Sequence, residues 1–191
     1  MFKIETDRLM ITEFTPDMAQ AVHENSLDDD NRRFVPDEVF ETVEDASETI
    51  EFLMSRYGGC EGPFVYPVLR KDKTNIGYVQ AVPLDGGIWE IGYHIGAKYT
   101  KHGYATEAVS AFLPVIMERI GVTKMAGICL ADNIASQKVM EKCGFILEFK
   151  GIDNYQGEQK EICRSGNAVK WDNLLLGGGL MCIQYKELTI S

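Results

Sequence analysis

The chain has 191 residues, of which 45% are hydrophobic and 25% are charged. This is an ordinary globular composition, which excludes a disordered, collagen-like or coiled-coil protein, and the length suits one domain over residues 1–191. There are 19 basic residues against 29 acidic ones, so the net charge is −10, the wrong sign for binding nucleic acid or anionic membranes. We therefore expect no nucleic acid and no membrane as partner, and a preference for cationic ligands.

Several common site signatures are missing from the sequence. The five cysteines form no C-x-x-C pair, and the three histidines show no H-E-x-x-H spacing. We therefore expect no disulfide framework and no metal, which fits a cytoplasmic location. The chain start lacks the apolar core of a signal peptide, and no stretch approaches the roughly 18 apolar residues of a membrane span. The motifs of serine hydrolases, P-loop NTPases and Rossmann proteins are also absent.

The N-terminal part predicts one strand and two helices. Alternating apolar and polar residues predict a strand over 6–14, and Pro16 then opens a short helix that runs to Ser26. The clustered charges of 27–33 predict a solvated loop. Apolar residues at helical spacing predict an acidic amphipathic helix over 42–57.

The rest of the chain predicts a meander followed by alternating helices and strands. Short polar turns separate three predicted antiparallel strands, over 64–70, 75–82 and 88–95. The elements that follow are a helix over 105–120 with Pro114 inside it, a strand over 124–130, a helix over 132–143, and strands over 145–155 and 158–164. Pro114 should kink its helix or cost a hydrogen bond. From Ser165 onward, we expect a flexible loop and a terminal strand over 180–188. This order predicts an α/β fold around one mixed sheet.

The junction between the third meander strand and the next helix predicts an anion-binding loop. Free backbone N–H groups converge at the positive end of a helix dipole, where phosphate binds without needing side chains. Small residues, Gly103 and Ala105, permit the close backbone approach that a phosphate requires. The alternative is that Gly103 only relieves a tight turn. The candidate loop consists of Thr100, Lys101, His102, Gly103, Tyr104, Ala105 and Thr106.

A second segment, 130–145, contains a candidate general acid. Asp132 or Asn133 can cap the helix that begins there, and Ser136 lies in its first turns. A hydroxyl that faces the end of the preceding strand could donate a proton to a leaving group. The alternative is that Ser136 is only solvated or caps the helix.

Together these segments resemble the Gcn5-related N-acetyltransferase (GNAT) family in motif and in order. The family's pyrophosphate pattern Q/R-x-x-G-x-G/A is similar to 100–105, with Thr100 in place of the usual Gln or Arg. Its later pattern N-x-x-S…K-x-G-F is matched by Asn133, Ser136, Lys142, Gly144 and Phe145. The runs 6–9 and 104–108 look like the RimJ/RimL-type branch, whose named members acetylate ribosomal-protein N-termini. The segment 165–191 does not resemble the family's usual last strand.

The resemblance implies a fold and a reaction. It implies a sheet of about seven strands with helices on both faces, in which two strands splay apart near Ile95 and Leu130. Acetyl-CoA would be the co-substrate, held by the loop 100–106 and by Asn133, unless Asn133 only caps its helix. A backbone N–H near His94 or Ile95 would polarise the thioester carbonyl.

The same resemblance assigns the proton transfers. Glu90 would be the general base that draws a proton from the amine, and Ser136 would be the general acid. His94 on the same strand is a competing base, because imidazole titrates near neutrality. The cysteines have no partner histidine in register, so an acyl-cysteine route is not expected.

The acceptor implied by the resemblance is a primary amine, and a cationic one suits the negative charge of the chain. A protein N-terminus is one candidate; a polyamine or an aminoglycoside is another. A further alternative is an acyl-CoA-binding module without catalysis, although the presence of both Ser136 and Glu90 favours an enzyme. The sequence is compatible with a monomer or a homodimer.

Overall fold

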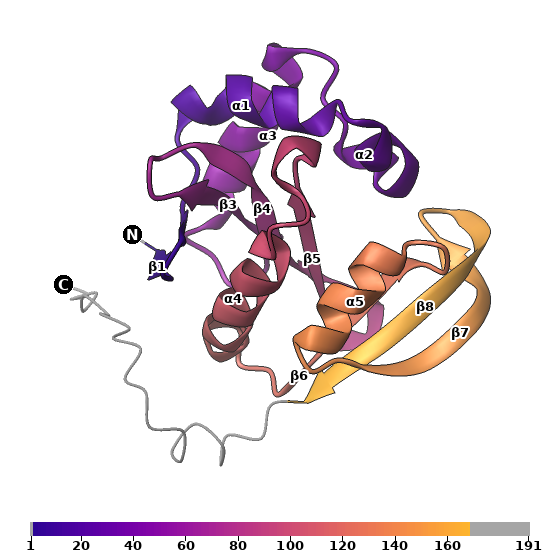
Figure 1. Ribbon diagram of the computed structural model, residues 1–191. Coiled ribbons are helices and arrows are strands. Elements are labelled where there is room, and N and C mark those ends of the chain that lie inside the picture. Colours follow the sequence, from indigo (N-terminus) through magenta and orange to yellow (C-terminus); the bar gives the residue numbers. More distant parts are fainter. Residues whose placement is uncertain (1, 169–191) are drawn as a thin grey trace.

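A computed structural model describes residues 2–168, so the predicted terminal strand over 180–188 lies outside the described residues. The fold is built on one mixed sheet of eight strands in the order β1-β2-β3-β4-β5-β6-β8-β7 (Figure 1). All neighbouring pairs are antiparallel except β5 and β6. The strands are β1 (Lys3–Glu5), β2 (Leu9–Thr12), β3 (Phe64–Arg70), β4 (Asn75–Pro83), β5 (Trp89–Ile95), β6 (Lys124–Leu130), β7 (Ile146–Tyr155) and β8 (Glu158–Ala168).

Helices cover both faces of this sheet, which confirms the predicted α/β architecture. The helices are α1 (Ala19–Ser26), α2 (Asp29–Phe34), α3 (Val43–Arg56), α4 (Tyr104–Ile120) and α5 (Ile134–Lys142), and the 3-10 turns are η1 (Pro16–Met18), η2 (Pro36–Glu38), η3 (Asp85–Gly87) and η4 (Ala97–Tyr99). No helix of the described part is both long and apolar enough to cross a membrane.

Each face of the sheet has its own hydrophobic core. Side chains alternate along a strand, so Phe64 and Tyr66 of β3 pack with Phe112 of α4, whereas Val65 between them packs with Ile50 of α3 and with α1. Figure 1 shows α4 and α5 in front of the sheet and α1 and α3 toward its other side. The two faces of β5 therefore present different side chains to different sets of helices.

The sheet opens between its two parallel strands. The register of β5 and β6 consists of one pair, Glu90 with Ala126, and beyond it the strands run on to Ile95 and Leu130 without pairing. Unpaired backbone groups at such an opening are available to a ligand. The predicted splay is confirmed, and it starts beside Glu90.

The N-terminal segment forms two strands where the sequence predicted one. β1 and β2 pair as a hairpin with Ile4 opposite Ile11, and the Thr6 N–H donates to the Leu9 carbonyl at 3.0 Å. The prediction of a single strand over 6–14 was wrong because the polar turn at 6–8 was not distinguished from strand alternation. This hairpin accounts for an eighth strand in place of the expected seven.

The predicted loop over 27–33 was also wrong, because it contains α2. The Asp28 carboxylate accepts the Asn31 N–H at 2.8 Å and so caps the helix. Acidic residues follow in the first turn and Arg32 and Arg33 stand in the last, an order that favours the helix dipole. The same charges that indicated solvent exposure therefore stabilise a short helix.

Two further differences concern helix α4 and strand β8. Helix α4 continues through Pro114 and ends at Gly121, whose φ of 71° is left-handed. Strand β8 extends beyond Ser165 to Ala168, because residues 165–168 pair with the start of β6. The change of character expected at Ser165 therefore does not occur there.

Candidate active site

The predicted anion-binding loop connects η4 to the N-terminus of α4. Lys101 and Gly103 have left-handed φ values of 66° and 79°, and the Gly103 carbonyl accepts the first helical hydrogen bond, from Glu107 at 3.1 Å. The first N–H groups of α4, those of Tyr104 to Thr106, have no acceptor within the helix. Lys101, His102 and Gly103 are exposed. This geometry fits the phosphate groups of a CoA molecule.

Two side chains of this loop stabilise the loop itself. The Thr100 hydroxyl donates to the Ala97 carbonyl at 3.0 Å, and Nδ1 of His102 lies 3.0 Å from the Thr100 carbonyl. Thr100 therefore replaces the usual Gln or Arg without offering a long side chain to a ligand. The backbone N–H groups are therefore the part of the loop that could bind an anion.

Ser136 lies on the α4 side of the splay, against strand β5. Its hydroxyl is 2.9 Å from the Tyr93 hydroxyl, which also contacts the Ser136 carbonyl at 2.9 Å. The Asn133 side chain accepts the Ser136 N–H at 3.0 Å, so Asn133 caps α5. Capping was one of the two roles expected for Asn133. Burial raises the pKa of Tyr93, which keeps this phenol protonated at neutral pH. Two hydroxyl groups therefore lie together where a leaving thiolate would need a proton.

Tyr93 was not predicted from the sequence. Its position on the same strand as Glu90 was a usable signal, because alternation places residues 91, 93 and 95 on the face opposite Glu90. Burial raises the pKa of the neighbouring Cys129 thiol to about 11, which disfavours the thiolate that a nucleophile requires.

Glu90 lies on the opposite face of β5. Burial is the main cause that raises the pKa of Glu90 to about 7; a hydrogen bond from the Ile128 backbone acts against it, and the negative charge of Glu38 adds to it. A carboxylate with a pKa near neutrality suits a general base that must accept and release a proton at neutral pH. The structure thus places Glu90 and Ser136 at the same splay, on opposite faces.

His94 has a partner of its own. Its Nε2 atom lies 3.4 Å from Oδ2 of Asp28, and its hydrogen bond is the main reason why the pKa of Asp28 falls to about 2. Asp28 also caps α2 and accepts the Ala97 N–H at 3.2 Å. His94 therefore joins β5 to α2 and η4, which makes it a weaker candidate for the base than Glu90.

The backbone of β5 decides which N–H faces the splay. Every second residue of an antiparallel strand bonds to its neighbour. The Gly96 N–H donates to the Ile76 carbonyl at 2.9 Å, which places the His94 N–H in the ladder with β4, opposite Tyr78. The Ile95 N–H points toward the β6 side and is the candidate that could polarise a thioester carbonyl.

A second carboxylate, Glu38, was not predicted. It ends the turn η2, and its Oε1 accepts a hydrogen bond from Nε2 of Gln80 at 3.0 Å. No sequence signal indicates Glu38, because residues 27–41 lack any pattern that ties them to β5. Among residues 2–168, no group of His, Cys, Asp and Glu side chains is arranged as a metal site.

The fold and the site define an α/β protein with a splayed sheet, a free helix N-terminus beside the splay, and carboxyl and hydroxyl groups on its two faces. Residues 8–146 match the family model described as the acetyltransferase (GNAT) domain. The chain belongs to the GNAT family of acetyltransferases, whose members use acetyl-CoA, and this supports an acyltransferase enzyme.

Three similar proteins extend this assignment. The uncharacterised N-acetyltransferase YnaD of Bacillus subtilis is 32% identical over 142 residues, which are 74% of this chain and 81% of YnaD. A GNAT-family acetyltransferase structure from Bacillus anthracis has a TM-score of 0.75 and 26% identity, and covers 87% of this chain and 98% of its own. RimL, an α-N-protein acetyltransferase of ribosomal L7/L12 solved with coenzyme A, shares the fold with a TM-score of 0.74 at 15% identity, over 88% of this chain and 98% of its own.

Proposed function

We propose that this chain transfers the acetyl group of acetyl-CoA directly to a primary amine, with Glu90 as the general base and Ser136 as the general acid. The observation that carries this proposal is their placement on opposite faces of β5 where β5 and β6 separate. A thioester between the two strands would have the leaving sulfur near Ser136. The amine would approach from the face of Glu90.

Acetyl-CoA fits the described residues. The N-terminus of α4 offers backbone N–H groups to the pyrophosphate, and the strands separate in front of it. The Ile95 N–H would bind the thioester oxygen as negative charge develops on it. Acetyl-CoA supplies the activated acetyl group, and the side chains of the chain move the protons.

The proton steps balance as follows. An alkylammonium group gives one proton to the Glu90 carboxylate, and the free amine attacks the carbonyl carbon. The C–S bond breaks as the C–N bond forms, and the thiolate takes a proton from Ser136 or, through it, from Tyr93. The nitrogen loses its second proton to solvent, Ser136 regains a proton from solvent, and Glu90 releases the proton it took. The net products are an amide, free CoA thiol and one released proton.

We propose a peptide N-terminus as the acceptor and a RimJ/RimL-like branch for the chain. Support comes from the motif runs 6–9 and 104–108 and from the shared fold with RimL, which acts on ribosomal L7/L12. The net charge of −10 favours any cationic acceptor, so a polyamine or an aminoglycoside is the second candidate.

The decisive experiment measures free thiol. The protein is incubated with acetyl-CoA and, in separate reactions, a peptide with a free N-terminus, spermidine and kanamycin. We expect thiol release above the buffer rate and a matching acetylated product with the peptide. Thiol release with only spermidine or kanamycin would show that the acceptor is not a peptide. Binding of CoA with no thiol release in the presence of any amine would indicate a binding module.

A further inference from the structure

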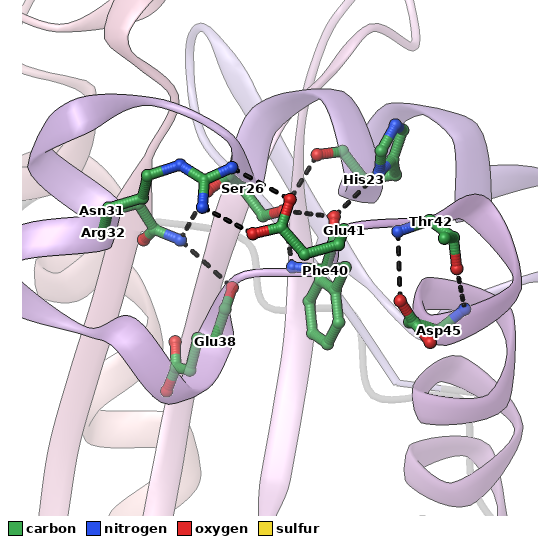
Figure 2. A network of polar contacts seen from close by, with 9 residues as sticks. All are labelled: His23, Ser26, Asn31, Arg32, Glu38, Phe40, Glu41, Thr42 and Asp45. Atoms are coloured by element: carbon green, nitrogen blue, oxygen red, sulfur yellow. Dashed lines mark hydrogen bonds and ion pairs between the residues drawn. The ribbon is translucent and has the colours of Figure 1, made fainter.

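Hydrogen bonds from neighbouring side chains to the backbone hold the segment that carries Glu38 in position. Nδ2 of Asn31 donates at 3.0 Å to the carbonyls of Ser26 and Glu38, and the Ser26 hydroxyl accepts the Phe40 N–H at 2.9 Å. Figure 2 shows that the Glu38 carboxylate points away from this network. The network therefore fixes the backbone and leaves the carboxylate directed elsewhere, toward Gln80 of the central sheet.

The Glu38 carboxylate is only partly satisfied. Oε1 accepts from Gln80, but Oε2 is buried and accepts no hydrogen bond from the described residues. Neither Glu38 nor Glu90 pairs with a Lys or Arg among residues 2–168. A buried carboxylate without a cation is costly, and a positive ligand would offset that cost.

Glu38 and Glu90 belong to one site. Gln80, which binds Glu38, lies opposite Gly92 in the β4–β5 register, two residues from the Val82–Glu90 pair. The charge of Glu38 raises the pKa of Glu90, and both charges act on Tyr155 of β7. Three separate parts of the chain thus converge on the acceptor face of the splay.

The same site is bounded by contacts of α2 and η2 with the end of the β7–β8 hairpin. Nε2 of Gln156 donates to Oδ1 of Asp37 at 2.6 Å, and the Tyr155 hydroxyl lies 3.4 Å from the Phe34 carbonyl. Figure 1 shows α2 next to this end of the β7–β8 hairpin. These contacts connect the segment that carries Glu38 to the strands on the far side of the splay.

We propose that Glu38 is a second acceptor-binding residue, whose carboxylate binds the ammonium group of the acceptor beside Glu90 and thereby selects cationic amines. This inference rests on the proposed function. Glu38 supplies charge and orientation, and Glu90 takes the proton. The two carboxylates repel each other until the ammonium arrives between them, so the acceptor binds best when both are ionised.

A small cavity suggests how Glu38 could instead be purely structural. It has a volume of about 20 Å³ and borders Glu38, Asn31 and Asn75, and the Oδ1 of Asn31 and the Nδ2 of Asn75 are also buried without a partner. A cavity of this size holds one water molecule, which could bridge these groups. The test must therefore separate acceptor binding from mere support of the fold.

The test compares Glu38→Gln with Glu41→Gln. Glu41 lies on the same segment and forms an ion pair with Arg32, so its substitution removes the same charge and also loosens the segment. With the amine that supports turnover in the panel above, we expect Glu38→Gln to raise the KM for the amine about 10-fold. The KM for acetyl-CoA should not change, and Glu41→Gln should behave like the unmodified protein.

The pH profile gives a second readout that a structural role would not move. The titratable groups that act electrostatically on Glu90 are Glu38 from η2, Tyr155 from β7 and Cys129 from β6, and of these only Glu38 becomes charged near neutrality. Burial raises the pKa of Glu38 itself to about 7; the Gln80 hydrogen bond and His94 lower it, and Asp37 raises it, so Glu38 carries its full negative charge above about pH 7. Removing that charge lowers the pKa of Glu90. The rising part of the pH–rate profile should therefore move to lower pH in Glu38→Gln. An unchanged limb and an unchanged amine KM would overturn the proposal, as would equal changes in Glu41→Gln.

If no amine in the panel reacts, a measurement of amine binding still tests the proposal. Spermidine and the free peptide are added to the protein saturated with CoA, and the melting temperature is measured. We expect at least one of these amines to raise it in the unmodified protein and in Glu41→Gln, and less in Glu38→Gln. Equal shifts in all three proteins, or none, would refute a role for Glu38, whereas absent thiol release alone would refute only the proposed function.

Discussion

Arg8 and Glu107 are 99 positions apart in the chain and form an ion pair beside the anion-binding loop. Nε of Arg8 donates to Oε2 of Glu107 at 2.6 Å, and the Thr6 hydroxyl donates to Oε1 at 2.5 Å. Nη1 of Arg8 also donates to the His102 carbonyl at 3.0 Å, and its guanidinium lies 4.8 Å from the Tyr104 ring centroid. The two runs that look like the RimJ/RimL-type branch therefore meet in space, and together they hold the loop.

The first prediction concerns Arg8. Arg8→Ala removes the hydrogen bond that fixes the His102 carbonyl, so the loop must be ordered when CoA binds. We expect the Kd for CoA to rise about fivefold, since a hydrogen bond to a charged group contributes about 1 kcal/mol or more. Isothermal titration calorimetry measures this. Lys124→Ala, which removes an exposed ion pair with Glu148, is the control, and an equal loss there would contradict the role of Arg8.

The second prediction uses two glycines at the two ends of α4. Gly103 and Gly121 both have left-handed φ values, and a Cβ at either would find open space or only ordinary contact with Arg8. Valine at either position should therefore cost about 1–2 kcal/mol of stability through backbone strain. Only Gly103→Val should also lose the CoA-induced rise in melting temperature, because only Gly103 lies in the anion-binding loop. A full rise in Gly103→Val would remove the loop from the CoA site.

The third prediction assigns the proton of the leaving thiolate. Ser136→Ala should lower kcat about 10- to 100-fold, at or below the lower range for a general acid because water can partly replace it. The Ser136 N–H that Asn133 caps is retained, so CoA affinity should stay nearly constant. Tyr93→Phe is measured in parallel. A loss of kcat in Tyr93→Phe with normal turnover in Ser136→Ala would transfer the acid role to Tyr93.

The sequence predicted the parts of this fold that depend on local patterns. Periodicity and glycine positions were sufficient for α3, α4 and α5, and for strands β3 to β6. The sequence was less informative where a few polar residues decide between a loop and a helix. The cap that Asp28 provides for α2 needs one side-chain hydrogen bond, which charge clustering does not reveal.

The candidate site divides in the same way. Ser136 and the loop at 100–106 stand in recognisable motifs, and Glu90 stands at the start of a predicted strand; the structure brings them to one splay. Glu38 comes from a segment whose position is set by tertiary contacts such as its hydrogen bond to Gln80. No local pattern encodes such a contact, so only the folded chain could show it.

The fourth prediction distinguishes Glu90 from His94 as the base. The pKa of Glu90 is raised to about 7, so the rate should rise with pH through about 7 as this carboxyl ionises. A second rise that belongs to the free amine should follow at higher pH. Glu90→Gln should lose the first rise, and His94→Gln should keep it, because His94 is bonded to Asp28. Loss of the first rise in His94→Gln alone would make His94 the base.

The last prediction is that Glu90 destabilises the folded chain at neutral pH. The folded-state pKa of about 7 lies above the ordinary value of 4.5, so the folded state holds a proton that the unfolded state has already released. The free energy of unfolding should therefore fall as the pH rises from about 4.5 to about 7, and Glu90→Gln should remove the part of this fall that belongs to Glu90, leaving the part that belongs to Glu38. Urea unfolding at pH 5 and pH 8 measures it. Glu90→Gln should exceed the unmodified protein in stability by more at pH 8 than at pH 5. Glu41→Gln should show no such difference, because the ion pair with Arg32 lowers the pKa of Glu41 and its carboxyl is ionised at both pH values. A gap that is the same at both pH values would mean that Glu90 has an ordinary pKa, and it could not then serve as a base tuned to neutrality.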